Sequence, residues 1–320
     1  MGEFKILSID GGGIRGVLPA SYLAYIEEKL KDNDKIYEYF DMIVGTSTGA
    51  IIALALSLGI SAKDILKLYE EKGSSIFPIR PRKLNFGLIV PKYSNLKLKE
   101  ELKELLGEKT IINDCKTRVC IPTINITCGK IVVRKTRHHK DFEHDYLLPV
   151  WQVAAESSAA PGFFPAFEDG DKCQYIDGGL WANNPSLIGI AEALKLGYSL
   201  EQIKILSLGT GSNLIHKDGW KYKCLGLIGY GTSLVDITFQ AQSQGVLNIA
   251  KYLLKDRFDR MDITLPKTSS YIFFSKFGID KTGSVNSLKN FGKNEAKNSI
   301  ISVKTKYFQN KVTAFQPVPN

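Results

Sequence analysis

Apolar residues form short runs that alternate with glycine turns in the first sixty positions. Residues 4–9 are mostly apolar, which is typical of a buried strand, and they lead directly into Gly11 to Gly13. A second buried strand is predicted over 40–44; it breaks at Gly45 and is followed by an apolar helix over 48–58. Because strand, glycine turn and helix occur twice in succession, the pattern predicts an α/β fold with parallel strands.

Helical and strand patterns continue along the rest of the chain. Helices are predicted where apolar residues recur at helical spacing, over 19–30, 61–72, 96–106, 150–155, 186–196, 234–254 and 289–308. Strands are predicted over 119–127, 130–136, 175–176, 203–208 and 258–265. No repeat or low-complexity linker interrupts the chain, so we expect one domain over 1–320. Residues 1–212 carry the core motifs, and 213–320 are expected to form a mostly helical C-terminal extension of that domain.

Composition narrows the class of protein without choosing a function. Apolar residues make up 44 % of the chain and charged residues 23 %, which indicates a globular protein and excludes a disordered one. The formal net charge of +9 favours anionic partners, such as phospholipid headgroups, nucleic acid or acidic metabolites. No standard nucleic-acid signature accompanies this charge, so we expect no nucleic-acid polymer as a partner.

Basic side chains are most concentrated in one short stretch. It forms either a solvated loop or a patch that faces lipid headgroups, and the sequence leaves both open. Its members are Arg134, Lys135, Arg137, His138, His139 and Lys140.

Cysteine usage and hydropathy indicate the compartment. Five cysteines without a C-x-x-C pair indicate free thiols in a reducing compartment. No Cys/His spacing resembles a zinc site, so we expect no metal and no cofactor. The N-terminus reads as a strand rather than a signal peptide, and the longest apolar stretch, 50–58, is shorter than the roughly 20 residues that span a bilayer. We therefore expect a cytoplasmic protein that meets membranes peripherally.

The segment Gly45-Thr46-Ser47-Thr48-Gly49 fits the nucleophile-elbow pattern G-x-S-x-G. A strand that turns sharply into a helix forces its turn residue into a strained conformation, and flanking glycines let the backbone pass. Ser47 is then presented at a helix N-terminus, where backbone N–H groups favour negative charge. A plain turn with a capping serine remains an alternative for this motif on its own.

The segment Asp10 to Gly16, DGGGIRG, is a second glycine motif. Consecutive glycines let main-chain N–H groups approach an oxyanion, and one such donor contributes about 3 kcal/mol to acyl transfer. Gly11, Gly12 and Gly13 are therefore candidates for an oxyanion hole. Arg15 would either fix this loop or attract an anionic headgroup.

The same loop matches the dinucleotide fingerprint G-x-G-x-x-G. That fingerprint expects an acid about 20 residues further on, at the end of a second strand. Asp32 and Asp34 have the right distance but follow a helix, and the next strand begins only near Phe40. We rank a nucleotide-binding protein that uses the Gly11–Gly16 loop as the second hypothesis.

A nucleophilic serine needs a base. Surface positions are expected for all four histidines, His138, His139, His144 and His216, and none has a recognisable catalytic setting. Asp177, followed by two glycines at a strand end, is the remaining candidate. A carboxylate in direct contact with Ser47 could accept its proton if burial raised its pKa, so a Ser–Asp dyad is the most economical hypothesis.

In combination, these motifs resemble the patatin-like phospholipase family. The resemblance rests on DGGGIRG at 10–16, GTSTG at 45–49, SSAAPGFFPAF at 157–167, DGGLWANNP at 177–185 and LSLGTG at 206–211. It spans about two-thirds of the chain, and the part beyond about Asn213 aligns only loosely. Ser157 stands where threonine is common in the family.

This resemblance implies a three-layer α/β sandwich, with a mostly parallel central sheet and helices on both faces. It implies Ser47 as nucleophile, Asp177 as base and Gly11, Gly12 and Gly13 as the oxyanion hole, without a metal. Residues in supporting motif positions are Arg15, Gly45, Gly49, Gly178 and Gly179. The pocket walls are expected to include Leu54, Leu58, Phe163, Phe164 and Phe167.

The family's activity is hydrolysis of acyl esters in phospholipids or glycolipids. The chain also resembles bacterial members that degrade membranes in cyclic-nucleotide anti-phage signalling, which implies a cyclic-nucleotide activator. A catalytically inert lipid-binding or storage protein of the same fold remains an alternative, and formation of a homo-oligomer stays open.

Overall fold

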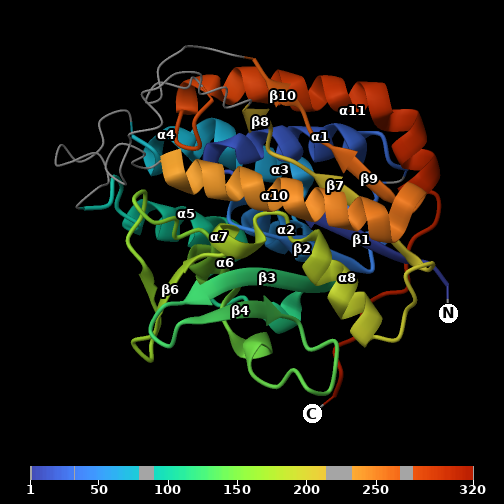
Figure 1. Cartoon of the computed structure of the whole chain (residues 1–320), viewed down its shortest axis with the longest axis horizontal. Helices are drawn as coiled ribbons and strands as arrows, with labels where there is room; N and C mark the ends of the chain where they lie inside the picture. Colours follow the sequence, from blue (N-terminus) through green and yellow to red (C-terminus); the bar gives the residue numbers. More distant parts are fainter. Residues whose placement is uncertain (1, 32, 79–89, 214–232, 267–276, 320) are drawn as a thin grey trace.

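The computed structural model describes residues 2–31, 33–78, 90–213, 233–266 and 277–319. Among the positions considered above, Asp32 and His216 lie outside these residues. An eight-stranded sheet lies between two layers of helices (Figure 1). Its strands, in spatial order, are β5 (Phe167–Glu168), β6 (Gln174–Asp177), β3 (Arg118–Asn125), β2 (Met42–Gly45), β1 (Phe4–Ile9), β7 (Ile203–Leu208) and β9 (Phe258–Met261), with β4 (Lys130–Lys135) also paired to β3.

The centre of the sheet is parallel and one side is antiparallel. The parallel pairings are β1–β2, β1–β7, β2–β3 and β7–β9. The antiparallel pairings are β3–β4, β3–β6 and β5–β6, so four of seven pairings are parallel. Only four residues connect β3 to β4, and a connection that short joins antiparallel neighbours. The predicted α/β class with a mostly parallel sheet is therefore confirmed.

Alternating side chains on the central strands serve two cores. In β1, Leu7 and Ile9 face one helical layer, while Phe4 and Ile6 face the other. Because both faces are covered, these strands are mostly apolar, which is the pattern that made them recognisable in the sequence.

The larger core is covered by α1 (Val17–Glu28), α2 (Thr48–Ser57), α3 (Ala62–Lys67), α5 (Leu96–Leu106), α6 (Val150–Ser157) and α11 (Val285–Tyr307). The opposite face carries α8 (Ser186–Lys195) and α10 (Ser233–Leu254). The predicted helix over 61–72 is divided into α3 and a π-helical turn, Leu68–Lys72, before α4 (Gly73–Ile76). The helix α7 (Gly179–Ala182) was not predicted. The single strand predicted over 258–265 is wrong, since β9 ends at Met261 and a separate β10 (Thr264–Leu265) pairs with β8 (Ser212–Asn213).

The C-terminal third adds to both layers and to the sheet. β9 extends the sheet beyond β7, α11 packs along α1, and α10 lies beside α7 and α8 (Figure 1). None of the described helices combines the length and apolar character needed to cross a bilayer.

The first two basic residues of the stretch at 134–140 form neither a solvated loop nor an outward-facing patch. Arg134 pairs with Glu156 at 2.9 Å and with Asp145 at 2.9 Å. Lys135 pairs with Glu192 at 2.5 Å. These charges are neutralised within the fold, because β4 places both side chains beside acidic residues of neighbouring elements.

The expected surface position is wrong for His138, which is 5 % exposed. Its ring nitrogens contact Thr136 at 2.9 Å and Glu192 at 3.2 Å. His139 is half-buried and His144 is exposed. A histidine buried by two polar partners cannot be distinguished from a surface histidine by local sequence.

Candidate active site

Two strands approach each other along the same edge of β3. β2 runs parallel to β3 and pairs Val44 with Cys120, while β6 runs antiparallel and pairs Asp177 with Thr123. The carboxyl ends of β2 and β6 therefore meet near Pro122. This arrangement brings Ser47, two residues beyond β2, to Asp177, the last residue of β6, across 130 positions of sequence.

Ser47 occupies a strained backbone conformation, with φ 55° and ψ −121°. Its flanking glycines are required by space. A Cβ on Gly45 would lie 2.1 Å from the carbonyl oxygen of Gly49, and a Cβ on Gly49 would lie 2.2 Å from that of Ile9. Such strain in a non-glycine residue is typical of functional sites, and the geometry is that of a nucleophile elbow.

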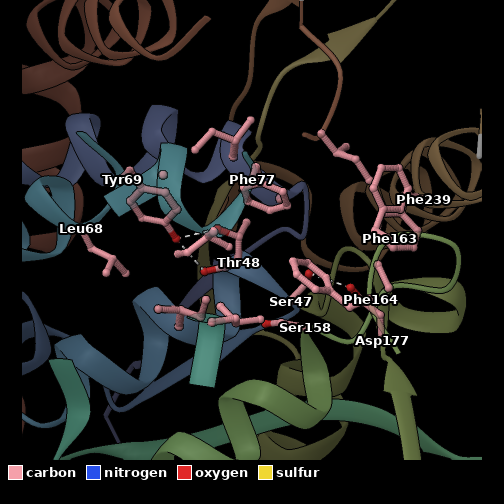
Figure 2. A pocket seen from close by; sticks show the side chains of 18 residues that line it. Ser47, Thr48, Leu68, Tyr69, Phe77, Ser158, Phe163, Phe164, Asp177 and Phe239 are labelled. Atoms are coloured by element: carbon pink, nitrogen blue, oxygen red, sulfur yellow. Dashed lines mark hydrogen bonds between the residues drawn. The ribbon is translucent and has the colours of Figure 1, made fainter. Parts of the chain in front are cut away.

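The side chains of Ser47 and Asp177 face each other (Figure 2). The Ser47 hydroxyl donates to Asp177 Oδ2 at 2.7 Å, and the Gly179 amide donates to Oδ1 at 2.7 Å. Asp177 is fully buried, and no ion pair to it is present among the described residues. Burial raises the pKa of Asp177 to about 7, while the hydrogen bonds from Ser47 and Gly179 act in the opposite direction.

A second serine occupies the gap between the two strand ends. The Ser47 amide donates to Ser157 Oγ at 2.9 Å, and the Ser157 hydroxyl donates to the carbonyl oxygen of Pro122 at 2.7 Å. Ser157 thus fixes the elbow backbone to β3. The sequence marked this position only through the family resemblance and gave no role to its hydroxyl.

In the glycine loop after β1, fewer amides are free to bind an oxyanion than the sequence predicted. The Gly11 amide donates to the carbonyl oxygen of Asn183 at 3.0 Å, so the expectation that it faces an oxyanion is wrong. Within the described part of the chain, the Gly12 and Gly13 amides have no acceptor, and Gly13 lines the pocket. The Thr48 amide, which follows Ser47, likewise has no described acceptor.

Arg15 is 2 % exposed and pairs with Asp236 of α10 at 2.9 Å. Of the two roles considered for Arg15, the structure therefore favours fixing the loop over attracting an external anion. Gly178 and Gly179 permit close packing after Asp177. A Cβ on Gly178 would lie 2.2 Å from the Pro122 carbonyl oxygen, and one on Gly179 would lie 2.7 Å from the ring of Phe239.

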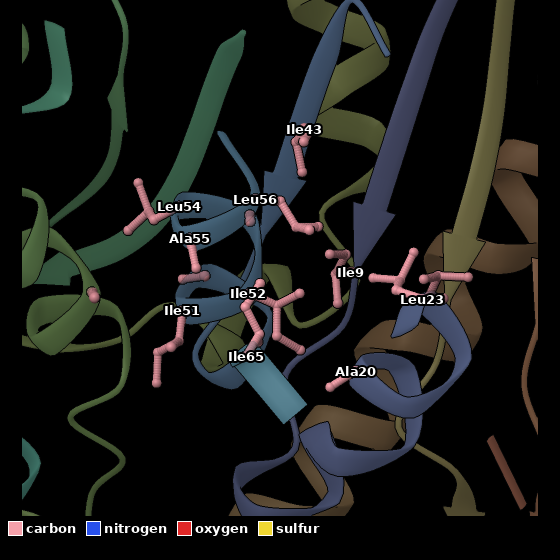
Figure 3. Packing of buried hydrophobic residues seen from close by; sticks show 14 of the residues in the cluster. Ile9, Ala20, Leu23, Ile43, Ile51, Ile52, Leu54, Ala55, Leu56 and Ile65 are labelled. Carbon is pink, nitrogen blue, oxygen red and sulfur yellow. The ribbon is translucent and has the colours of Figure 1, made fainter. Parts of the chain in front are cut away.

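A pocket of about 620 Å³, counting space open to solvent, extends from the dyad. Its walls are largely apolar and aromatic, and its residues include Ile51, Leu68, Tyr69, Ile76, Phe77, Leu98, Phe163, Phe164, Phe239 and Ile279 (Figure 2). Phe163 and Phe164 were expected there. Leu54, Leu58 and Phe167 do not line it: Leu54 packs in the core (Figure 3), and Phe167 packs against Trp151.

The acidic residue that a dinucleotide-binding loop requires is not found at the end of β2. β2 ends at Gly45, not at an acidic residue, and Asp34 lies before this strand. The Asp34 carboxylate is already bound by Tyr39 and Lys311, each at 2.5 Å. Within the described ranges, no free carboxylate at the end of the second strand is placed to bind a ribose.

One group of potential metal ligands occurs among the described residues, away from the dyad. The ligand atoms of Cys120, His138 and Glu192 lie within 4.8 Å of one another. His138 and Glu192 are hydrogen-bonded to each other, and Lys135 also pairs with Glu192. A cation there would have to displace an ammonium group, so this arrangement is better explained as a buried polar network.

Comparison with known proteins finds similarity to one family and to relatives described as phospholipases or patatins. Residues 7–189 match the family described as "Patatin-like phospholipase". A "cGAMP-activated phospholipase" of Escherichia coli is 37 % identical over 257 residues, covering 74 % of this chain and 72 % of that protein. A protein of the same description from Pseudomonas aeruginosa is 32 % identical, covering 93 % of this chain and 89 % of that protein. A "Probable inactive patatin-3-Kuras 1" of Solanum tuberosum is 32 % identical, covering 67 % and 64 %.

Proposed function

The chain belongs to the patatin-like phospholipase family, and we propose that it hydrolyses phospholipid acyl esters with Ser47 as nucleophile and Asp177 as general base. The observation that carries this proposal is the 2.7 Å hydrogen bond between the Ser47 hydroxyl and a fully buried Asp177 without a described cationic partner. A carboxylate with a pKa of about 7 is matched to proton transfer near neutral pH.

The first step acylates the enzyme. Asp177 accepts the hydroxyl proton as Ser47 Oγ bonds to the ester carbonyl carbon, and the carbonyl electron pair moves to oxygen. The Gly12 and Gly13 amides, with Thr48 as a third donor, stabilise this oxyanion, and each donor contributes about 3 kcal/mol. The carbon–oxygen bond to the leaving group then breaks, and Asp177 returns its proton to the departing lysophospholipid.

The second step releases the fatty acid. Asp177 accepts a proton from water as the water oxygen attacks the acyl carbon. The oxyanion forms again at the same amides, the bond to Ser47 Oγ breaks, and the proton passes from Asp177 to Ser47. Asp177 acts as base and acid in turn, so no histidine is needed.

The pocket supports a lipid substrate. Its apolar and aromatic walls suit an acyl chain, since burying each methylene contributes roughly 0.8 kcal/mol. We propose that the chain contacts membranes peripherally and draws an acyl chain into this pocket.

Regulation by a cyclic nucleotide is proposed from the bacterial relatives, which carry the description "cGAMP-activated phospholipase". We expect fatty-acid release to rise when cGAMP is added to the purified chain. Equal rates with and without cGAMP would remove this part of the proposal and leave the hydrolase intact.

The test of the hydrolase is product analysis with vesicles of mixed-acyl phosphatidylcholine and phosphatidylglycerol. The wild type and the Ser75→Ala control, changed at an exposed serine, should release fatty acid, whereas Ser47→Ala should not. A fluorophosphonate probe separates an active enzyme from an inert relative, because only an activated serine reacts. Release by folded Ser47→Ala at the wild-type rate would refute the proposal.

A further inference from the structure

The N-terminal half of α10 contacts the glycine loop after β1 and the segment after β6. It lies beyond Asn213, where the resemblance to the family is loosest. Asp236 pairs with Arg15, at the end of the glycine loop. Phe239 packs against Gly179, two residues after the proposed base. One turn further, Gln242 Oε1 accepts the amide of Asn184 at 2.8 Å.

Ser243 joins the two loops. Its hydroxyl donates to Asp10 Oδ2 at 3.1 Å and accepts from Asn183 Nδ2 at 2.9 Å. The main-chain carbonyl oxygen of Asn183 in turn accepts the hydrogen bond from the Gly11 amide. Thus Ser243 connects the loop after β1 to the segment after β6.

Asp236 and Ser243 are seven residues apart, which is about two helical turns or roughly 10 Å along the axis. Their partners, Arg15 and Asp10, flank the glycines that carry the oxyanion amides. The helix therefore holds the glycine loop at both ends with charged or hydroxyl groups. In the C-terminal half of α10, Val246, Ala250 and Leu254 are buried and pack the helix onto the fold through apolar contacts.

We propose that α10 is the positioning element of the oxyanion loop, with Asp236 and Ser243 as its positioning residues. This inference rests on the proposed function. The two residues touch no reacting atom; they set the distance between the Gly12 and Gly13 amides and Ser47. Because apolar contacts of the C-terminal half keep α10 attached, loss of the polar contacts loosens the loop without removing the helix.

The test compares Asp236→Asn and Ser243→Ala with Gln244→Ala, a control at the exposed neighbouring position on α10. Rates are normalised to folded protein by circular dichroism. We expect kcat for fatty-acid release to fall about 10- to 100-fold in the two variants, a partial loss of what one oxyanion donor supplies. KM should stay within about twofold, Ser243→Thr should recover most of the activity, and Gln244→Ala should match the wild type.

A thionoester substrate isolates the oxyanion. Sulfur accepts hydrogen bonds poorly, so the wild type should prefer the oxygen ester over the matched thionoester strongly. In Asp236→Asn and Ser243→Ala this preference should shrink, while the pH midpoint set by Asp177 stays unchanged. A general structural defect would lower both rates equally and leave their ratio constant.

An unchanged ester-to-thionoester ratio, or unchanged kcat, in both folded variants would overturn the role of α10. A wild type that neither releases fatty acid nor reacts with a fluorophosphonate would instead overturn the proposed function, and this inference with it. The two failures are therefore distinguishable.

Discussion

Two buried aspartates at strand ends of the central sheet have different surroundings. Asp10, which follows β1, is 2 % exposed and is bound by both terminal nitrogens of Arg260, at 2.8 and 2.7 Å. Asp177, at the end of β6, is 0 % exposed and, among the residues that the structure describes, accepts only a hydroxyl and an amide proton. The first region neutralises its carboxylate with a cation, and the second does not.

This difference separates an aspartate that is paired with a cation from the aspartate that we propose as the general base. Burial raises the pKa of Asp10, and the Arg260 guanidinium opposes that rise with the two-point geometry of an ionised pair. Burial raises the pKa of Asp177 to about 7, and this rise is opposed by the hydrogen bonds from Ser47 and Gly179 rather than by a cation. Burial alone therefore does not mark a base; the absence of a compensating charge does.

The largest expected effect comes from removing the uncompensated carboxylate. Asp177→Asn should lower kcat about 10⁴-fold, the upper end of what a general base contributes. Single-turnover measurement of fatty-acid release checks this. Asp262→Asn, at a residue that shares Arg260 but lies outside the dyad, is the control, and a variant Asp177→Asn with more than a tenth of wild-type activity would contradict the assignment.

The two aspartates should have opposite effects on the free energy of unfolding. Asp10→Asn leaves the 9 %-exposed Arg260 side chain with less negative charge and should cost about 3 kcal/mol. Asp177→Asn should stabilise the protein at pH 8 by up to about 4 kcal/mol, from a pKa shift of roughly three units. Urea unfolding at pH 8 measures both, and changes of the same sign would break the comparison.

The pH dependence follows from the same pKa. Below pH 7 the folded protein keeps a proton on Asp177, so log kcat/KM should rise by about one per pH unit and level off above about 7. For stability the sign is reversed. The folded chain holds this proton between the ordinary pKa of 3.8 and about 7, whereas the unfolded chain has lost it, so this contribution to stability decreases as pH rises across that window. In Asp177→Asn the decrease should vanish.

The smallest effect tests the neutral hydrogen bonds around the elbow. Ser157→Ala removes the acceptor of the Ser47 amide and the donor to Pro122, and should cost about 1–2 kcal/mol of stability while lowering kcat. Ser57→Ala is the control, because its buried hydroxyl bonds to Leu54 away from the dyad. Equal kcat in the two variants would show that Ser157 acts only on stability.

Local sequence was enough for most of the elements. The run over 4–9 and the pattern over 203–208 match β1 and β7 because strands buried on both faces are rich in apolar residues. The helix predicted over 96–106 coincides with α5. Short elements such as α7 carry too few residues for a period to emerge.

The contacts between residues of the site could be predicted less well from the sequence. The glycine and serine motifs indicated Ser47 and Asp177, but nothing local shows that Asn183 uses the Gly11 amide or that Arg15 binds Asp236. These contacts join segments 172 and 221 positions apart in the chain. Tertiary packing alone decides them, so the sequence predicted the helix over 234–254 but not its contacts with the site.

The meeting of β2 and β6 on one edge of β3 has a consequence for folding. Neither strand pair alone contains both reactive groups, since each contributes only one of them. In a chain in which either strand has not yet docked, or has docked one position out of register, the proposed Ser47–Asp177 dyad cannot form. Reaction of Ser47 with a fluorophosphonate during refolding would therefore report when the second of these two strands joins the sheet. By the same reasoning, the proposed hydrolase cannot cleave membrane lipids before both strands have docked.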